Sequence, residues 1–130
     1  MDYKDITDSV SINYLGSIIV AKESFEYLKR SRGSLLLFTS SSYTRGRMLY
    51  ALYSSAKAAV VNLMQALNEE WHSSSVRINC ICPERTKTPM RIKNFGNEPE
   101  DSLCSAEKVA DYSIAALISE ISGEVIDVRK

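Results

Sequence analysis

The sequence predicts an α/β fold in which about three parallel strands are flanked by helices. Short apolar runs at 34–39, 76–82 and 124–128 have the length and composition of strands in a parallel sheet. Longer amphipathic segments precede and separate them, and their apolar spacing indicates helices. Strands that alternate with helices form βαβ crossovers, which give a parallel sheet. A length of 130 residues suits one domain.

The helices can be placed by their caps and apolar faces. Asp8 can cap the first helix, which is expected to end near Gly33. Its buried face is predicted to hold Val10, Tyr14, Ile18, Ala21, Phe25 and Leu28. A second helix is predicted at about 49–72, and its buried residues would be Ala56, Val60, Leu63, Met64, Leu67 and Trp71. A third helix is expected to start at or near 105–107 and to reach about Ser119.

The longest segment without regular structure is expected at about 83–101, which holds all three prolines. A loop of that length in a compact domain is usually functional or disordered. This segment is therefore a candidate for binding residues.

Composition argues against several functions. The chain has 16 basic and 16 acidic residues, so no basic surface indicates a nucleic-acid partner. No apolar run approaches the ~18 residues of a membrane span, and the first residues do not begin a signal peptide. Cys80, Cys82 and Cys104 lack C-x-x-C spacing, which favours free thiols over metal ligands or disulfides. We expect a cytoplasmic protein without a metal site or a membrane partner.

Tyr53 and Lys57 are the candidate reactive pair. Residues four apart on a helix lie one turn above the other, and a nearby ammonium stabilises a phenolate. Such a phenol can exchange protons nearer neutral pH. By itself the pair could equally be a surface tyrosine and lysine. Ser40, after the first strand, could simply bond loop backbone, and Asn13 could bond within its helix.

Taken together, these residues resemble the short-chain dehydrogenase/reductase family. The matches are Ile12-Asn13, Ser40 at a strand end, Tyr-x-x-x-Lys, and Pro-x-x-x-x-Thr-Pro-Met from Pro83 to Met90. The resemblance implies the C-terminal half of a Rossmann-like doubly wound parallel sheet. The family's other half carries a Gly-rich turn for the cofactor pyrophosphate, and no G-x-G occurs here. Residues 1–130 are therefore expected to form a partial domain that holds the catalytic half.

The resemblance also implies roles for these residues in an NAD(P)-dependent oxidoreductase, with NADP favoured over NAD. Tyr53 would exchange a proton with the substrate oxygen, and Lys57 would also hold the nicotinamide ribose. Ser40 would hydrogen-bond the reacting oxygen, and Asn13 would hold a water that connects Lys57 to solvent. The remaining cofactor contacts are assigned to the loop residues Pro83, Thr86 and Thr88.

The loop after the second strand suggests a substrate class. Where the family usually has Pro-Gly, this chain has Pro83-Glu84, which puts the usual loop conformation in doubt. Arg85 and Arg91 could bind a substrate phosphate, or the loop could be a solvated basic segment. The pattern resembles the reductase domain of bifunctional cytidylyltransferase/ribulose 5-phosphate reductases, which make CDP-ribitol with NADPH. This implies a carbonyl or sugar-phosphate substrate and a role in capsule biosynthesis.

Two functions remain open. The chain could be the catalytic half of a reductase, or a truncated, non-catalytic module that folds and oligomerises without binding the cofactor. The first strand would present an apolar, unpaired edge, which favours pairing with another chain. A homo-oligomer or a complementing N-terminal half is the expected partner.

Overall fold

A computed structural model describes all of residues 1–130. Its three strands, β1 (Ser34–Phe38), β2 (Arg77–Pro83) and β3 (Val125–Val128), form one parallel sheet with β2 in the centre. The helices are α1 (Tyr3–Val10), α2 (Gly16–Ser31), α3 (Ala51–Glu70), α4 (Pro89–Phe95) and α5 (Ala106–Ile118). The predicted α/β fold with three parallel strands is confirmed.

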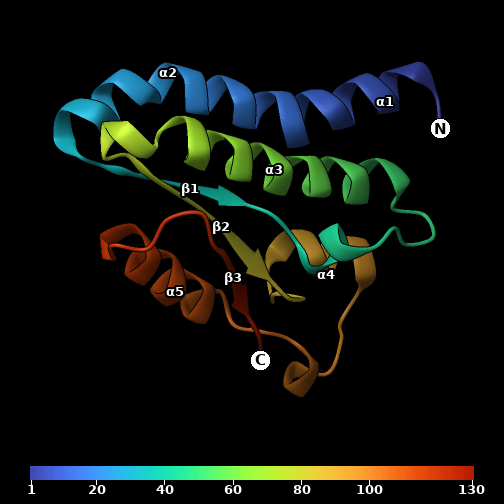
Figure 1. Ribbon diagram of the computed structural model, residues 1–130. Helices are drawn as coiled ribbons and strands as arrows, with labels where there is room; N and C mark the ends of the chain where they lie inside the picture. The colour runs from blue at the N-terminus through green and yellow to red at the C-terminus, as the bar shows by residue number, and fades with distance from the viewer.

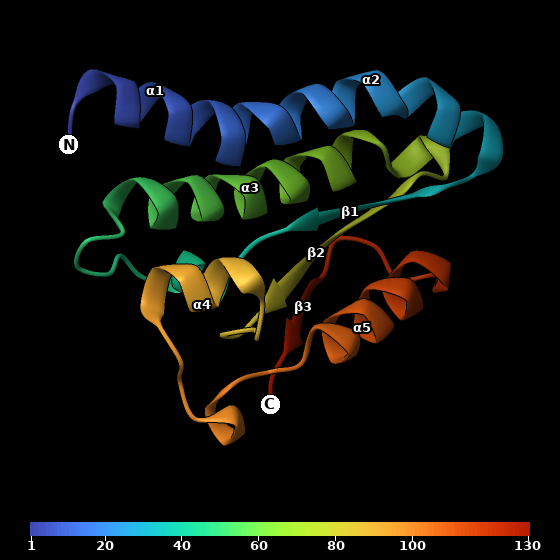
Figure 2. The same cartoon turned by 180° about the vertical axis from the view of Figure 1, so that it is seen from behind.

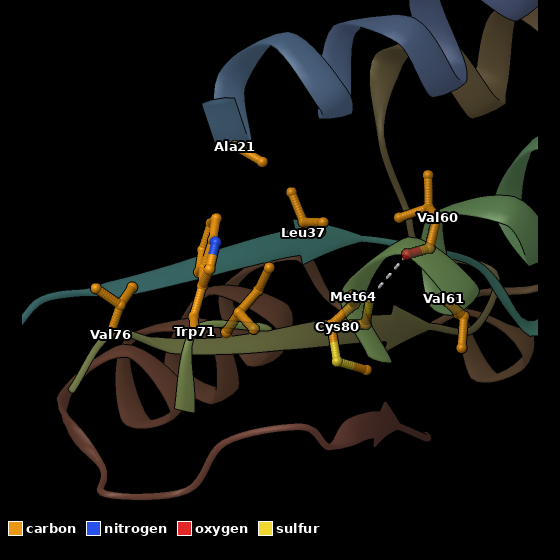
Figure 3. Packing of buried hydrophobic residues seen from close by; sticks show 9 residues of the cluster. Ala21, Leu37, Val60, Val61, Met64, Trp71, Val76 and Cys80 are labelled. Atoms are coloured by element: carbon orange, nitrogen blue, oxygen red, sulfur yellow. Dashed lines mark hydrogen bonds between the residues drawn. The ribbon is translucent and has the colours of Figure 1, made fainter. Parts of the chain in front are cut away.

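The sheet is a central layer with helices on both faces. Helices α2 and α3 cover one face and α5 covers the other (Figure 1). The larger core lies between α2, α3 and the sheet (Figure 3), and it contains Ala21, Leu37, Val60, Val61, Met64, Trp71, Val76, Ile78 and Cys80. A smaller core on the side of α5 contains Ile81, Cys104, Val109 and Val128. Strand β2 is therefore buried on both faces, as a central parallel strand should be.

The first helical segment starts earlier than the sequence predicts. Asp2, and not Asp8, caps it, because the Asp2 and Asp5 side chains each accept a hydrogen bond from the other residue's backbone N–H. Asp8 lies inside α1, where it pairs with Lys4. No residue of α1 is buried, and Val10 is 42% exposed, so the predicted buried face is wrong at its first position. Apolar periodicity indicates only helices that bury a face, so it could not indicate α1, which has no buried residue.

A second correction concerns segment 83–101, which is not without regular structure. Helix α4 lies within it. Thr88 caps this helix by accepting a hydrogen bond from the Arg91 backbone N–H at 3.2 Å, and Pro89 occupies a position where the first turn needs no N–H donor. The same proline that favoured a loop therefore begins a helix.

Helices α3 and α5 agree with the sequence prediction to within a few residues. The predicted core positions Ala56, Val60 and Met64 of α3 are buried, and Trp71 closes its C-terminal end. Ser105 caps α5 by accepting from the Lys108 backbone N–H at 3.0 Å. All three cysteines are free and buried. None of the helices has the length and apolar character needed to cross a membrane.

Candidate active site

The candidate residues converge at the C-terminal end of the sheet. Because the strands are parallel, their C-terminal ends lie at the same end of the sheet, and the β1 arrow points to the side where α3 begins and α4 lies (Figure 2). Ser40 follows β1, Pro83 closes β2, and Tyr53 is in the first turn of α3. Topology therefore brings together residues from three separate parts of the sequence.

Lys57 fixes α3 to the end of β1. Its ammonium donates to the Phe38 carbonyl at 3.0 Å, and its own carbonyl accepts from Thr39 Oγ1 at 2.9 Å. The ammonium lies over the Tyr53 ring, 5.6 Å from the ring centroid. Burial of the side chain lowers the pKa of Lys57. The predicted proximity of Tyr53 and Lys57 is observed, whereas their catalytic roles stay predictions.

Ser40 begins a short helical turn over Ser41–Thr44. Its Oγ accepts from the Ser42 backbone N–H at 3.3 Å and from Ser42 Oγ at 3.1 Å. This is the loop-backbone bond that the sequence left open as the ordinary interpretation. Because Ser40 Oγ accepts in both bonds, its own proton remains available for a substrate oxygen.

Asn13 lies in a π-helical turn, Ser11–Leu15, between α1 and α2. Its Nδ2 donates to the Ser9 carbonyl at 3.1 Å, which is the local bond that the sequence kept as an alternative. The turn packs against α3, the helix that carries Tyr53 and Lys57. A single π turn inside a helix is rare and frequently marks a functional site. No residue type in this segment signals it.

The predicted cofactor loop makes local bonds. Thr86 Oγ1 donates to the Glu84 carbonyl at 2.9 Å, and Thr88 caps α4. The backbone around Thr86 pairs with Cys104, which fixes the loop to the segment before α5. Pro83 is the last residue of β2 and not a loop residue, whereas Thr86 and Thr88 lie beyond the strand, as expected. The cofactor contacts of all three stay predictions.

Glu84 explains how the loop does without the family's glycine. It is not among the residues with positive φ, so the backbone here needs no glycine. Its N–H donates to the Val128 carbonyl at 3.1 Å, and Arg129 donates to its carboxylate at 2.9 Å. The hydrogen bond from Arg129 lowers the pKa of Glu84. Glu84 therefore ties the end of β2 to the residues after β3.

Arg85 and Arg91, the predicted phosphate ligands, meet at one carboxylate. Arg91 binds Glu98 in bidentate fashion, with Nε at 2.5 Å from Oε2 and Nη2 at 2.9 Å from Oε1. Arg85 Nη1 lies 3.4 Å from the same Oε1. Hydrogen bonding from Arg91 is the main cause that lowers the pKa of Glu98. Proximity of the two arginines is therefore observed, and their common partner is one that the sequence analysis missed.

Sequence reasoning also missed an aromatic contact between α4 and α3, the helix that carries Tyr53 and Lys57. The Phe95 ring stacks on Tyr50 with centroids 6.3 Å apart, and Tyr50 meets Tyr53 edge-on at 6.1 Å. The Arg91 guanidinium lies over the Phe95 ring, 4.6 Å from its centroid. Two aromatic side chains, Phe95 and Tyr50, thus connect Arg91 to Tyr53. The only signal in the sequence was the aromatic residue three positions before Tyr53.

The donors at this end of the sheet are suited to a nicotinamide ribose. An ammonium has three N–H donors, and Lys57 uses one of them on Phe38, so donors remain for hydroxyl groups. The side chains of Tyr53 and Lys57 are only half-buried, which leaves them accessible. In chemical terms the C-terminal end of the sheet carries a phenol, a hydroxyl and an ammonium, from Tyr53, Ser40 and Lys57.

Known proteins resemble this chain in sequence. A model of the short chain dehydrogenase family matches residues 1–99. Bcs1 of Haemophilus influenzae, a bifunctional ribulose 5-phosphate reductase/CDP-ribitol pyrophosphorylase, is 56% identical over 98% of this chain and 27% of its own. The uncharacterized oxidoreductase YciK of Escherichia coli is 33% identical over 74% of this chain and 38% of its own.

Solved structures show the same fold. A short chain dehydrogenase/reductase family protein matches 98% of this chain with a TM-score of 0.90 at 20% identity. ElxO with NADP bound matches the same share with a TM-score of 0.86, also at 20% identity. The chain spans 57% and 58% of these two structures and well under half of the two curated relatives.

Proposed function

This chain belongs to the short-chain dehydrogenase family, an oxidoreductase family that binds NAD(P), and we propose that it carries the catalytic half of an NADPH-dependent sugar-phosphate reductase. The observation that carries the proposal is the attachment of α3 to the end of β1 through Lys57 and Phe38. This hydrogen bond holds α3, and with it Tyr53, at the C-terminal end of the sheet, where Ser40 also lies. Together with a dinucleotide-binding half, this chain would act in the cytoplasm on ribulose 5-phosphate or a similar sugar phosphate.

In this proposal Tyr53 gives a proton to the carbonyl oxygen of the substrate. Ser40 donates a hydrogen bond to the same oxygen and so stabilises the negative charge that develops there. The Lys57 ammonium, which lies over the Tyr53 ring, favours the phenolate that remains. Asn13 sits in the π turn packed on α3, where it would hold the water through which the proton is replaced.

The cofactor site is proposed from the donor set of this chain. Lys57 would bind the ribose hydroxyls with the donors that Phe38 leaves free. Pro83, at the end of β2, and Thr86 and Thr88, in the segment after it, would border the nicotinamide. When bound, the cofactor supplies the hydride for the carbonyl carbon. The pyrophosphate would be held by a Gly-rich turn outside these 130 residues, because the chain contains no G-x-G.

The substrate proposal depends on Arg85 and Arg91. Two guanidinium groups that already meet at one carboxylate would also meet at a phosphate in its place. The 56% identity to a ribulose 5-phosphate reductase supports this substrate class. Use of the product for CDP-ribitol, and so for capsule, belongs to the same proposal.

Arg91→Lys tests the substrate class. The variant keeps the charge but loses the bidentate geometry, so we expect KM for ribulose 5-phosphate to rise by about 10- to 100-fold, since a hydrogen bond to a charged group contributes about 1.5–3 kcal/mol. The matched control is Lys93→Ala, an exposed residue on the same helix, which should change KM little. The readout is steady-state NADPH oxidation with the chain joined to a family dinucleotide-binding half. Equal KM values for wild type and Arg91→Lys would contradict the phosphate role.

The alternative is a module that folds and associates but does not bind the cofactor. The exposed Phe38 at the end of edge strand β1, 51% accessible, supports it, because such an edge suits a partner. A titration of NADPH onto residues 1–130 distinguishes the two forms. The module should bind very weakly alone, whereas tight binding would show that the chain needs no further half.

A further inference from the structure

The ion-pair cluster on α4 is built around one carboxylate. Glu98 and Arg91 each expose only about a fifth of their side chains, at 19% and 20%, whereas neighbouring pairs such as Lys87 with Glu100 are far more exposed. Arg85 adds a third charged side chain on the same carboxylate. The cluster is therefore more enclosed than an ordinary surface ion pair.

The charges of this cluster do not balance. Arg85 and Arg91 supply two positive charges, and Glu98 supplies one negative charge, so the three together carry a net charge of +1. A phosphate monoester carries between one and two negative charges at neutral pH and offers three acceptor oxygens. Phosphate would therefore satisfy the two guanidinium groups more completely than the single carboxylate does.

We propose that Glu98 is an internal occupant of the substrate-phosphate site, and that phosphate displaces it from Arg85 and Arg91. The inference rests on the proposed function, since it takes the two arginines as the phosphate ligands. Before substrate binds, Glu98 holds both guanidinium groups in the required orientation. It also competes with phosphate, so it sets how tightly the site binds phosphorylated substrates.

Aromatic contacts connect the proposed phosphate site to Tyr53, the proposed reaction centre. Arg91 lies over Phe95, Phe95 stacks on Tyr50, and Tyr50 meets Tyr53. Replacement of Glu98 by phosphate keeps Arg91 in place, so these stacked rings remain a fixed spacer. The spacer determines how far the substrate phosphate lies from the carbonyl that Tyr53 would protonate. Glu98 is thus a positioning residue for Arg91 and a competitor for its ligand.

The test compares two carboxylates of the same segment. Glu98→Gln removes the competing charge, and Glu100→Gln is the matched control because it removes an equal charge from an exposed pair with Lys87. Binding of inorganic phosphate to residues 1–130 is measured by calorimetry at fixed ionic strength. We expect the Kd to fall about tenfold, equivalent to ~1.4 kcal/mol, in Glu98→Gln and to stay within about twofold in Glu100→Gln.

Several outcomes would overturn the proposal. One is an equal effect of both variants, which would mean that only net charge matters. Another is unchanged or weaker phosphate binding in Glu98→Gln, which would make Glu98 a support for the arginines and not a competitor. A third is that neither the unaltered chain nor Glu98→Gln binds phosphate. These measurements need no cofactor and no turnover, so a failure here is distinguishable from a failure of the proposed reductase activity.

A second measurement uses the unaltered chain and does not depend on the folding of a variant. The hydrogen bond from Arg91 lowers the pKa of Glu98, and displacement would remove that bond. The carboxylate carbon of Glu98, followed by NMR during a pH titration, should therefore show a higher pKa when phosphate is saturating than when it is absent. An identical titration with and without phosphate would contradict displacement.

Discussion

At the scale of single residues, Lys57 both attaches α3 to the sheet and lies beside Tyr53, whose proton transfer it is proposed to assist. It bonds the end of β1 through Phe38, lies over the Tyr53 ring, and is partly buried, which lowers its pKa. The sequence could predict that Tyr53 and Lys57 share a helix face. It could not predict the bond to Phe38, which joins residues 19 positions apart and exists only once α3 packs on the sheet.

The cysteines give a residue-scale prediction. Cys80 and Cys82 are fully buried, and burial raises the pKa of each thiol to about 12. The thiolate is the reactive form, so the folded chain should show no fast reaction with a disulfide reagent at pH 8, and unfolding in urea should release all three thiols. A fast-reacting thiol in the folded protein would contradict this packing.

The same thiols predict a pH dependence of stability. Their folded pKa values lie above the ordinary 9.0, so the folded state keeps these protons more firmly than the unfolded chain does. The resulting stability is fully present below about pH 9 and is lost as pH rises towards 12. Urea unfolding at pH 8 and pH 10.5 should show a lower free energy of unfolding at the higher pH.

At the scale of elements, the turn before β3 depends on Gly123. Its φ is +82°, and a Cβ there would lie 2.6 Å from Asn68 Nδ2, beside the bond from Ser122 to Asn68. Gly123→Ala should lower the free energy of unfolding by more than about 1 kcal/mol, because alanine resists positive φ. Gly46→Ala is the matched control, since Gly46 has open space and no positive φ. Similar unfolding midpoints for both variants would contradict the assignment.

The elements also show where sequence reasoning succeeds and where it fails. The strands, α3 and α5 follow from apolar periodicity because each buries a face against the core. Helix α1 buries nothing, so its start at Tyr3 left no apolar signal. Helix α4 has only seven residues and begins with Pro89, and the π turn at Ser11–Leu15 contains no residue that marks it. The contact of Glu98 with Arg85 and Arg91 depends on α4 and could not be inferred without it.

At the scale of the whole molecule, β1 forms one edge of the sheet and β3 the other. Phe38 on β1 is half exposed, and the outer face of α5 exposes Ile114, Leu117 and Ile118. The chain spans little more than half of the solved structures that share its fold. We therefore propose that a complementing dinucleotide-binding half, or a second copy, covers the β1 edge.

The most direct test of the catalytic proposal is NADPH oxidation with ribulose 5-phosphate. It is measured for residues 1–130 alone and for the same residues joined to a Gly-rich, dinucleotide-binding half of a family member. We predict activity only in the joined protein, and a loss of about 10²- to 10⁴-fold in kcat on Tyr53→Phe, as removal of a general acid should give. A joined Tyr53→Phe protein as active as the unaltered one would contradict the role of Tyr53.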